Sequence, residues 1–150
     1  MSVHQRIAIT GASGLIGTAL VGHLKAEGHT VQRLVRRAPV GADEVQWDPQ
    51  TGFVDLEPLR GVDAVIHLAG VGVGDKRWSK KYKSEILNSR LLGTTAIAKA
   101  VAELKPQVFI SASAIGWYGE SGNRAVVETD RAGDDFLAAV CREWEAAADL

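Results

Sequence analysis

Residues 6–17 read RIAITGASGLIG, a short apolar run followed by a glycine-rich segment. The run Arg6–Thr10 predicts a β-strand, and the apolar spacing over Leu15–Glu27 predicts a helix directly after it. The glycines of this segment are Gly11, Gly14 and Gly17. A strand that turns through such glycines into a helix is typical of the first unit of a parallel, doubly wound α/β fold.

Each glycine has a distinct predicted role in this turn. Gly11 allows the sharp turn, Gly14 lets a ligand approach the backbone, and Gly17 lets the helix pack closely on the strand. The N–H groups and the dipole at the helix start favour a diphosphate. Glycines at this spacing also occur in ordinary loops, but the preceding strand and following helix favour phosphate binding. The predicted phosphate contacts are Gly11, Ser13, Gly14, Leu15, Ile16 and Gly17.

The rest of the sequence alternates between strand-like and helix-like patterns, which predicts a parallel sheet. Four further strands are predicted at Thr30–Val35, Glu44–Trp47, Ala64–Leu68 and Val108–Ser113. Two further helices are predicted at Lys81–Leu104 and Asp135–Leu150, and a tight turn at Asp48–Gly52. We therefore expect one Rossmann-type domain over 1–150, with strand order 3-2-1-4-5, helices on both faces, and a ligand crevice between strands one and four.

Composition restricts the partners and the cellular setting. The 17 Lys and Arg residues nearly balance the 18 Asp and Glu residues, so no global field attracts nucleic acid or an anionic membrane. The single cysteine, Cys141, cannot form an internal disulfide, which favours a reducing compartment and a cytoplasmic protein. No apolar run has the length of a membrane helix or a signal peptide. The last helical pattern still runs where the sequence stops, so we expect a truncated protein.

The end of the second predicted strand indicates which dinucleotide is bound. Folds selective for NAD carry an acidic residue there, about 20 residues after the turn, to bind the ribose. This sequence has Arg36 and Arg37 instead, and a guanidinium can bind a 2′-phosphate through charge-assisted hydrogen bonds. The pattern favours NADP(H). The alternative is that both arginines, with Arg33, only begin a solvated loop.

Several further motifs carry a family resemblance. They are Trp47-Asp48-Pro49, His67-Leu68-Ala69-Gly70, Lys76-Arg77-Trp78, Ser89-Arg90, residues 111–119 (SASAIGWYG) and Trp144-Glu145-Ala146-Ala147. With the GxxGxxG turn, the sequence resembles the extended short-chain dehydrogenase/reductase superfamily. Within it, the sequence is similar to the epimerase-like family named after nucleoside-diphosphate-sugar epimerases, some members of which are labelled cell-division inhibitors. Members of that family are about twice as long, which also suggests truncation before a substrate-enclosing segment.

The resemblance implies a set of cofactor contacts beyond the turn. Arg37 matches the arginine that relatives carry before a similar loop. The other implied contacts are the backbone of Leu68, Ala69 and Gly70 and the side chains of Glu85 and Arg90. From their spacing alone, Glu85 and Arg90 are ordinary charges on a helix surface.

The resemblance also implies a catalytic serine and a tyrosine four residues before a lysine. Ser111 and Ser113 alternate onto one face near the carboxyl end of the fifth predicted strand, and Ser113 is the preferred candidate. Such a serine could instead only satisfy backbone groups at a strand end. The expected Tyr-x-x-x-Lys pair is missing, because residues 135–141 read DFLAAVC. Tyr118 could act as the acid or pack over the cofactor.

The leading hypothesis is an NADP(H)-binding, epimerase-like oxidoreductase that acts on a small molecule of unknown identity. The alternative is a redox sensor or scaffold that binds NADP(H) without turning it over, because the usual proton-transfer pair is missing. A third, weaker hypothesis is nucleic-acid binding by the basic cluster Lys76–Lys83, which is more readily explained as a solvated helix start. No metal site is predicted; His67 and Cys141 are expected to be packing residues.

Overall fold

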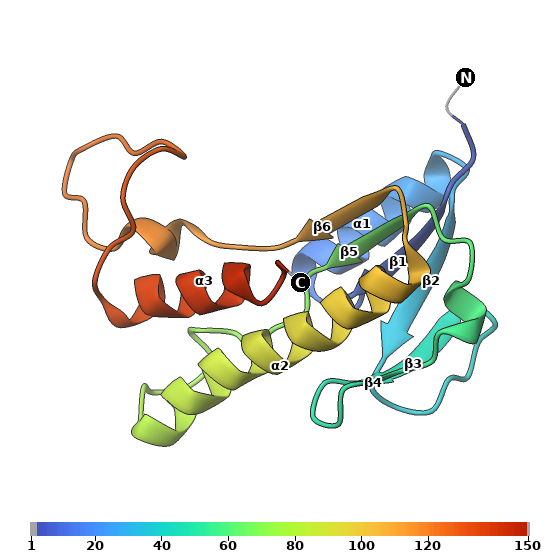
Figure 1. The fold of residues 1–150 in the computed structure, drawn as a ribbon, viewed down its shortest axis with the longest axis horizontal. Helices are drawn as coiled ribbons and strands as arrows, with labels where there is room; N and C mark the ends of the chain where they lie inside the picture. The colour runs from blue at the N-terminus through green and yellow to red at the C-terminus, as the bar shows by residue number, and fades with distance from the viewer. Residues whose placement is uncertain (1–2, 150) are drawn as a thin grey trace.

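The computed structural model describes residues 3–149 as a six-stranded sheet with helices on both faces (Figure 1). The strands are β1 (Arg6–Thr10), β2 (Thr30–Val35), β3 (Glu44–Asp48), β4 (Phe53–Val54), β5 (Ala64–His67) and β6 (Val108–Ser111). The helices are α1 (Leu15–Ala26), α2 (Lys80–Leu104) and α3 (Phe136–Ala146), with short 3-10 turns η1 (Glu57–Leu59) and η2 (Ile115–Tyr118). This is a Rossmann-like α/β fold.

The sheet order is β4-β3-β2-β1-β5-β6. Strands β3, β2, β1, β5 and β6 are parallel neighbours, which confirms the predicted order of the five strands. The strand order reverses beside β1: the chain places β2, β3 and β4 on one side of β1, and then returns to place β5 and β6 on the other. Ligands of open α/β sheets bind at such a reversal of strand order, beyond the carboxyl ends of the strands.

The prediction of a wholly parallel sheet is wrong at one edge. After the predicted turn at Asp48–Gly52, strand β4 pairs antiparallel with β3, with Trp47 opposite Val54. The turn itself is confirmed: Gly52 has φ of +77° and its N–H donates to the Asp48 carbonyl at 2.9 Å. Strand β4 was missed because two residues are too few to show an alternating pattern.

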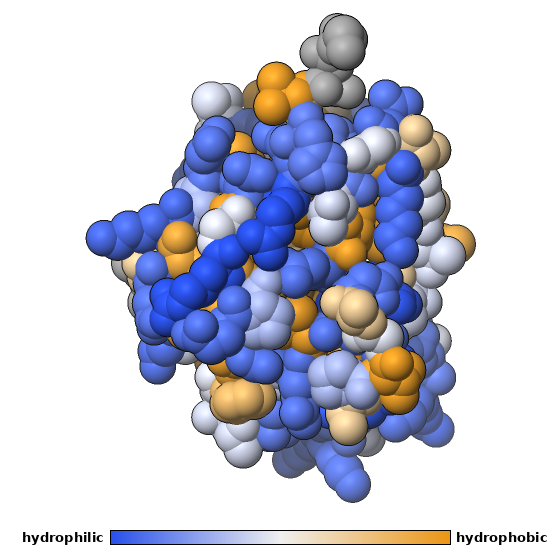
Figure 2. All heavy atoms as spheres, turned by 90° about the vertical axis from the view of Figure 1, so that its right-hand side faces the viewer, coloured by the Kyte–Doolittle hydropathy of each residue, from blue (hydrophilic) through white to orange (hydrophobic). Residues whose placement is uncertain are grey.

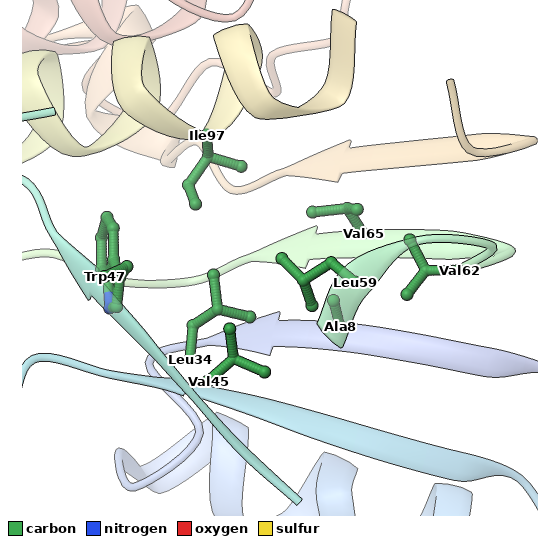
Figure 3. Close-up of a cluster of buried hydrophobic side chains, with 8 residues drawn as sticks. All are labelled: Ala8, Leu34, Val45, Trp47, Leu59, Val62, Val65 and Ile97. Carbon is green, nitrogen blue, oxygen red and sulfur yellow. The ribbon is translucent and has the colours of Figure 1, made fainter. Parts of the chain in front are cut away.

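Helices α1 and α2 cover opposite faces of the sheet because successive strand residues point in opposite directions. On one face, Ile7 and Ile9 pack with Leu20 of α1. On the other face, Ala8 and Val65 pack with Ile97, which points from α2 toward the sheet in Figure 3. Ile9 and Ile97 are completely buried, so the central strands are covered on both sides.

The last two predicted elements are shorter than expected. Strand β6 ends at Ser111, two residues before the predicted end at Ser113. Helix α3 starts after Asp135, whose side chain accepts a hydrogen bond from the Ala138 N–H at 2.8 Å, and it ends at Ala146. The expectation that this helix continues to the end of the sequence is therefore wrong up to residue 149, and Leu150 lies outside the described residues.

The surface is predominantly polar on the side shown in Figure 2, where apolar residues form small, separate spots. Within residues 3–149, no helix combines the length and the apolar character needed to cross a bilayer.

Candidate dinucleotide-binding site

The turn between β1 and α1 requires glycine at two of its three glycine positions. Gly11 has φ of +67°, and a Cβ there would lie 2.9 Å from the Ala69 backbone nitrogen. A Cβ at Gly17 would lie 2.1 Å from the Gly11 carbonyl oxygen. Such distances exclude side chains, so the close approach of the 68–69 backbone fixes Gly11 as glycine, and the close approach of the turn backbone fixes Gly17.

Gly14 is different because the protein itself leaves space for a side chain. A Cβ at this position would meet only the Gly11 carbonyl oxygen, at an ordinary contact distance of 3.4 Å. Gly14 is the N-cap of α1 and offers no side-chain oxygen, and the first turn holds no acidic residue. The N–H groups of the helix start are thus left for an external anion, and glycine at this position keeps the approach open.

Two large apolar side chains accompany this helix start. Leu15 is 93% exposed and Ile16 is 69% exposed, although both belong to the first turn of α1. Ser13 is also exposed. The predicted phosphate-binding residues therefore lie together at the carboxyl end of β1, with apolar surface beside polar N–H groups. That combination suits a ligand with phosphates and an aromatic base.

A buried hydrogen-bond network connects β1 to β5 and α2 behind the turn. The Thr10 hydroxyl oxygen accepts from the N–H groups of Leu68 (3.1 Å) and Ala69 (3.2 Å). Since this oxygen already accepts two bonds, its O–H donates to His67 Nδ1 at 2.7 Å, and His67 Nε2–H donates to the Thr94 hydroxyl at 3.1 Å. The network holds the backbone that faces Gly11.

His67 is confirmed as a buried strand residue. Burial lowers the pKa of its imidazole from 6.5 to about 4, so the ring is neutral at physiological pH. A neutral ring can accept at Nδ1, as the network requires. Sequence reasoning did not identify Thr10, although its position directly before Gly11 in a buried strand was a usable signal.

The end of β2 carries a cluster of paired charges. Arg37 donates from both terminal nitrogens to the Glu44 carboxylate, each at 2.7 Å, and Arg33 pairs with Asp43 at 3.0 Å and with Glu44 at 3.2 Å. The hydrogen bonds from Arg37 hold the pKa of Glu44 near 2. Arg36 is exposed, and its side chain makes no hydrogen bond within residues 3–149. Arg33 and Arg37 are therefore ordered by pairing, unlike the arginines of a solvated loop.

The residues of α2 that the resemblance implies as cofactor contacts have clear structural partners. Glu85 lies 3.8 Å from the Lys76 ammonium in a partly exposed ion pair. Arg90 donates to the Val71 carbonyl at 2.9 Å, and its guanidinium lies 4.8 Å from the centre of the Trp144 ring. Arg90 also lies against Gly70, so it connects α2, α3 and the loop that follows β5.

The basic cluster at the start of α2 is partly engaged by aromatic rings. Lys83 lies 5.6 Å from the Trp78 ring centre and 5.0 Å from that of Phe136. Ser79 caps the helix by accepting from the Tyr82 N–H at 3.1 Å. These contacts give the cluster a structural role at the junction of α2 and α3.

Ser113 and Tyr118 line the same open pocket, of about 340 Å³, beyond the end of β6. The Ser113 hydroxyl donates to the Glu145 carboxylate at 2.5 Å. The partner is thus a side chain of α3 and not the backbone of the strand end. Sequence reasoning quoted Glu145 only as part of a motif and missed it as a site residue. The remaining lining residues are Ala114, Ile115, Trp117 and Glu128.

Helix α3 turns an apolar face toward this region. A Cβ at Gly116 would lie 3.3 Å from Leu137 Cβ and 3.7 Å from Cys141 Sγ, so these two residues, four apart, face the loop after β6. Cys141 donates to the Ala114 carbonyl at 3.7 Å, and burial raises the pKa of its thiol. The face contains neither a phenol nor an ammonium group, and Cys141 is confirmed as a buried packing residue.

Comparison with known proteins supports this arrangement of turn and strands. Residues 7–136 match the NAD dependent epimerase/dehydratase family. The chain belongs to this family. An epimerase family protein of Mycobacterium leprae is 46% identical over 141 residues, which are 94% of this chain and 46% of that protein. The human epimerase family protein SDR39U1 is 34% identical over 97% of this chain and 50% of its own length. The chain thus spans about half the length of these curated relatives.

Solved structures show the same likeness. A nucleoside-diphosphate sugar epimerase from Corynebacterium glutamicum superposes with a TM-score of 0.84 and 40% identity, over 98% of this chain and 31% of that one. Human SDR39U1 (isoform 2) with NADPH superposes with a TM-score of 0.81 and 32% identity, over 95% of this chain and 48% of that one. MoeE5 in complex with UDP-glucose and NAD superposes with a TM-score of 0.78 and 26% identity, over 95% of this chain and 48% of that one.

Proposed function

We propose that residues 1–150 form the NADP(H)-binding domain of an epimerase-like oxidoreductase with a small-molecule substrate. The observation that carries the proposal is the turn, in which packing fixes Gly11 and Gly17 while Gly14 is left open on the ligand side. Membership of a family named for NAD dependence makes a nicotinamide dinucleotide the ligand class. Among the similar structures, human SDR39U1 carries NADPH and MoeE5 carries NAD, so the end of β2 has to decide between the two cofactors.

The residues at the carboxyl end of β1 and β5 fit the pyrophosphate and its surroundings. The N–H groups at the start of α1 would hold the diphosphate, and Leu15 and Ile16 would cover apolar parts of the ligand. The backbone of 68–70, held by Thr10 and Arg90, would pass along the cofactor. Bound NADP(H) would supply the hydride chemistry. A contact between Glu85 and the cofactor is implied by the family resemblance and remains a prediction.

The 2′-phosphate would be read at the end of β2. Arg36 is exposed and Arg37 is about half exposed, so both guanidinium groups are accessible to a phosphate. No acidic side chain occupies the position directly after β2 where NAD-selective folds carry one. We therefore propose NADPH over NADH as the preferred cofactor.

The chemistry of the whole protein is a separate part of the proposal. Ser113 and Tyr118 would face the substrate, and Glu145 is the ionisable group in direct contact with Ser113. A second candidate function is NADP(H) binding without turnover, as in a sensor or scaffold. It is favoured by residues 135–141 (DFLAAVC), which lack the Tyr-x-x-x-Lys pair that the superfamily pattern carries at the start of the last helix. The cytoplasmic location stays a prediction.

Calorimetric titration of NADPH and NADH into wild type and the Arg36→Ala/Arg37→Ala double variant tests the cofactor choice. A charge-assisted hydrogen bond contributes roughly 10- to 150-fold in affinity, and solvent exposure of the arginines places the expected preference near the lower end. We expect NADPH to bind about 10-fold more tightly than NADH, and the double variant to lose this preference. Equal affinities for the two cofactors in wild type, or an unchanged preference in the variant, would rule out recognition of the 2′-phosphate by Arg36 and Arg37.

A further inference from the structure

We infer that Glu44 is a positioning residue for 2′-phosphate recognition, because it holds one end of the Arg37 guanidinium and leaves the Nε–H edge without a protein partner within residues 3–149. The inference rests on the proposed NADP(H) binding and adds a residue that no sequence motif of the cofactor site contains. Glu44 is the first residue of β3, in register with Arg33 of the neighbouring strand β2.

The Glu44 carboxylate is buried and fully engaged. Its side chain is 2% exposed, although the Arg37 side chain that covers it is 55% exposed. One oxygen accepts from Arg37 at 2.7 Å and from the Val40 N–H at 2.9 Å. The other accepts from Arg37 at 2.7 Å and from Arg33 at 3.2 Å. A carboxylate with four donors at fixed positions defines the orientation of the guanidinium it binds.

The contacts of Arg37 use one end of its guanidinium. Nη1 donates to Glu44 and to the Ala38 carbonyl, at 2.7 and 3.0 Å, and Nη2 donates once to Glu44. A guanidinium has five N–H donors. The Nε–H and the second Nη2–H, which lie on the same edge, have no partner within residues 3–149. Two parallel donors on one edge match two oxygens of a phosphate.

Charge balance leaves this region attractive to an anion even though two carboxylates belong to it. Four cations (Lys25, Arg33, Arg36, Arg37) stand against Asp43 and Glu44, a net charge of +2. Asp43 is shared by Lys25 at 3.1 Å and Arg33 at 3.0 Å, so it does not compete for Arg37. A phosphate would bind the Nε edge of Arg37 without displacing Glu44.

Pre-ordering of Arg37 has a measurable consequence. A long side chain that becomes immobile only when the ligand binds lowers the ligand affinity by about 2- to 12-fold, compared with a side chain that is already ordered in the free protein. In Glu44→Gln, one acceptor oxygen becomes an NH2 group, so the paired hydrogen bonds with Arg37 cannot both form. We expect Glu44→Gln to bind NADPH about 2- to 12-fold more weakly and to bind NADH with unchanged affinity.

The experiment measures NADPH and NADH affinities of the wild-type chain, Glu44→Gln, Arg37→Ala and the control Glu57→Gln, which alters an exposed ion pair with Arg60. NADH affinity reports on the intact turn, so a general folding defect weakens both cofactors. If Glu44→Gln does not fold, Glu44→Asp keeps the charge but shortens the side chain and is expected to show the same selective loss for NADPH.

The outcomes separate the inference from the proposed function. Loss of NADPH preference in Arg37→Ala and a smaller selective loss in the Glu44 variant support both. If Arg37→Ala loses the NADPH preference while the Glu44 variant binds NADPH with unchanged or higher affinity, the positioning role alone is overturned. A higher affinity would identify Glu44 as a competitor of the phosphate. An Arg37→Ala variant that retains the full preference overturns the positioning role, since Arg37 then does not bind the phosphate, and leaves Arg36 as the candidate. Equal affinities of the wild-type chain for NADPH and NADH overturn the proposed cofactor choice.

Discussion

The two halves of this domain build their sites in different ways. The β1–α1–β2 half forms its site mainly from backbone: two glycines fixed by contacts below 3 Å and a helix start with no capping side chain. The β6–α3 half forms its pocket from side chains on a loop and a helix, with Ser113 and Glu145 separated by 32 positions in the sequence.

The difference leads us to expect cofactor binding without catalysis in this chain. Backbone geometry at the turn leaves few alternatives, because any side chain at Gly17 collides with the backbone of Gly11 and Ala12. In the β6–α3 half, Leu137 and Cys141 pack against Gly116, and residues 135–141 contain neither a tyrosine nor a lysine.

Gly17→Ala should have the largest effect. Its Cβ would lie 2.1 Å from the Gly11 carbonyl oxygen, and overpacking of this kind costs about 3 kcal/mol. Gly22→Ala is the matched control on the same helix, since nothing lies within 4 Å of its Cβ, and it should gain up to about 1 kcal/mol. Urea unfolding measures both changes. Equal stabilities of the two variants would mean that the turn is not closely packed.

His67 should make stability depend on pH. The pKa of the folded imidazole is about 4, below its ordinary 6.5, so the unfolded chain binds more protons between these values. The stabilisation is complete above pH 6.5 and decreases as the pH falls, by up to about 3 kcal/mol at pH 4. Unfolding measured from pH 7 to 5 should show this slope in wild type and in the exposed control His23→Gln. If His67→Gln keeps the same dependence of unfolding free energy on pH, another group is responsible for that dependence.

The NADPH preference should weaken as salt is added. The Debye length decreases from about 10 Å at 0.1 M to about 3 Å at 1 M, so an exposed phosphate–guanidinium pair is screened. The NADH affinity, which depends mainly on the turn, should change less than the NADPH affinity. Calorimetry at several salt concentrations measures the ratio, and a ratio independent of salt would argue against a surface ion pair as its source.

Ser113→Ala should have the smallest effect on folding and cofactor affinity. Its hydroxyl is exposed and lies outside the turn, so we expect a stability change within about 0.5 kcal/mol and unchanged NADPH affinity. Without the tyrosine–lysine pair, the isolated chain should show no ordinary turnover of NADPH with small carbonyl compounds. Rapid NADPH oxidation that Ser113→Ala and Tyr118→Phe abolish would show that the pocket is a complete active site.

The sequence predicted the turn and the five parallel strands because their signals are local. Glycine spacing and apolar runs appear within a few residues of each other, and tertiary packing agrees with them. The pairing of Arg37 with Glu44 and of Ser113 with Glu145 could not be predicted, since each joins residues of different elements. Strand β4 is too short to show a pattern. The C-terminus of α3 at Ala146 is followed by Ala147 and not by the glycine that commonly marks a helix end.

The most direct test of the account is to locate NADPH on the chain by backbone amide NMR. We predict that titration with NADPH shifts the amide signals of 13–17, Arg36, Arg37 and Ala69 first and most strongly, because these residues surround the turn and the end of β2. Lys99 on the far part of α2 should not respond. Shifts confined to the pocket around Tyr118, or no shifts at saturating NADPH, would contradict the assignment of this half of the domain to the cofactor.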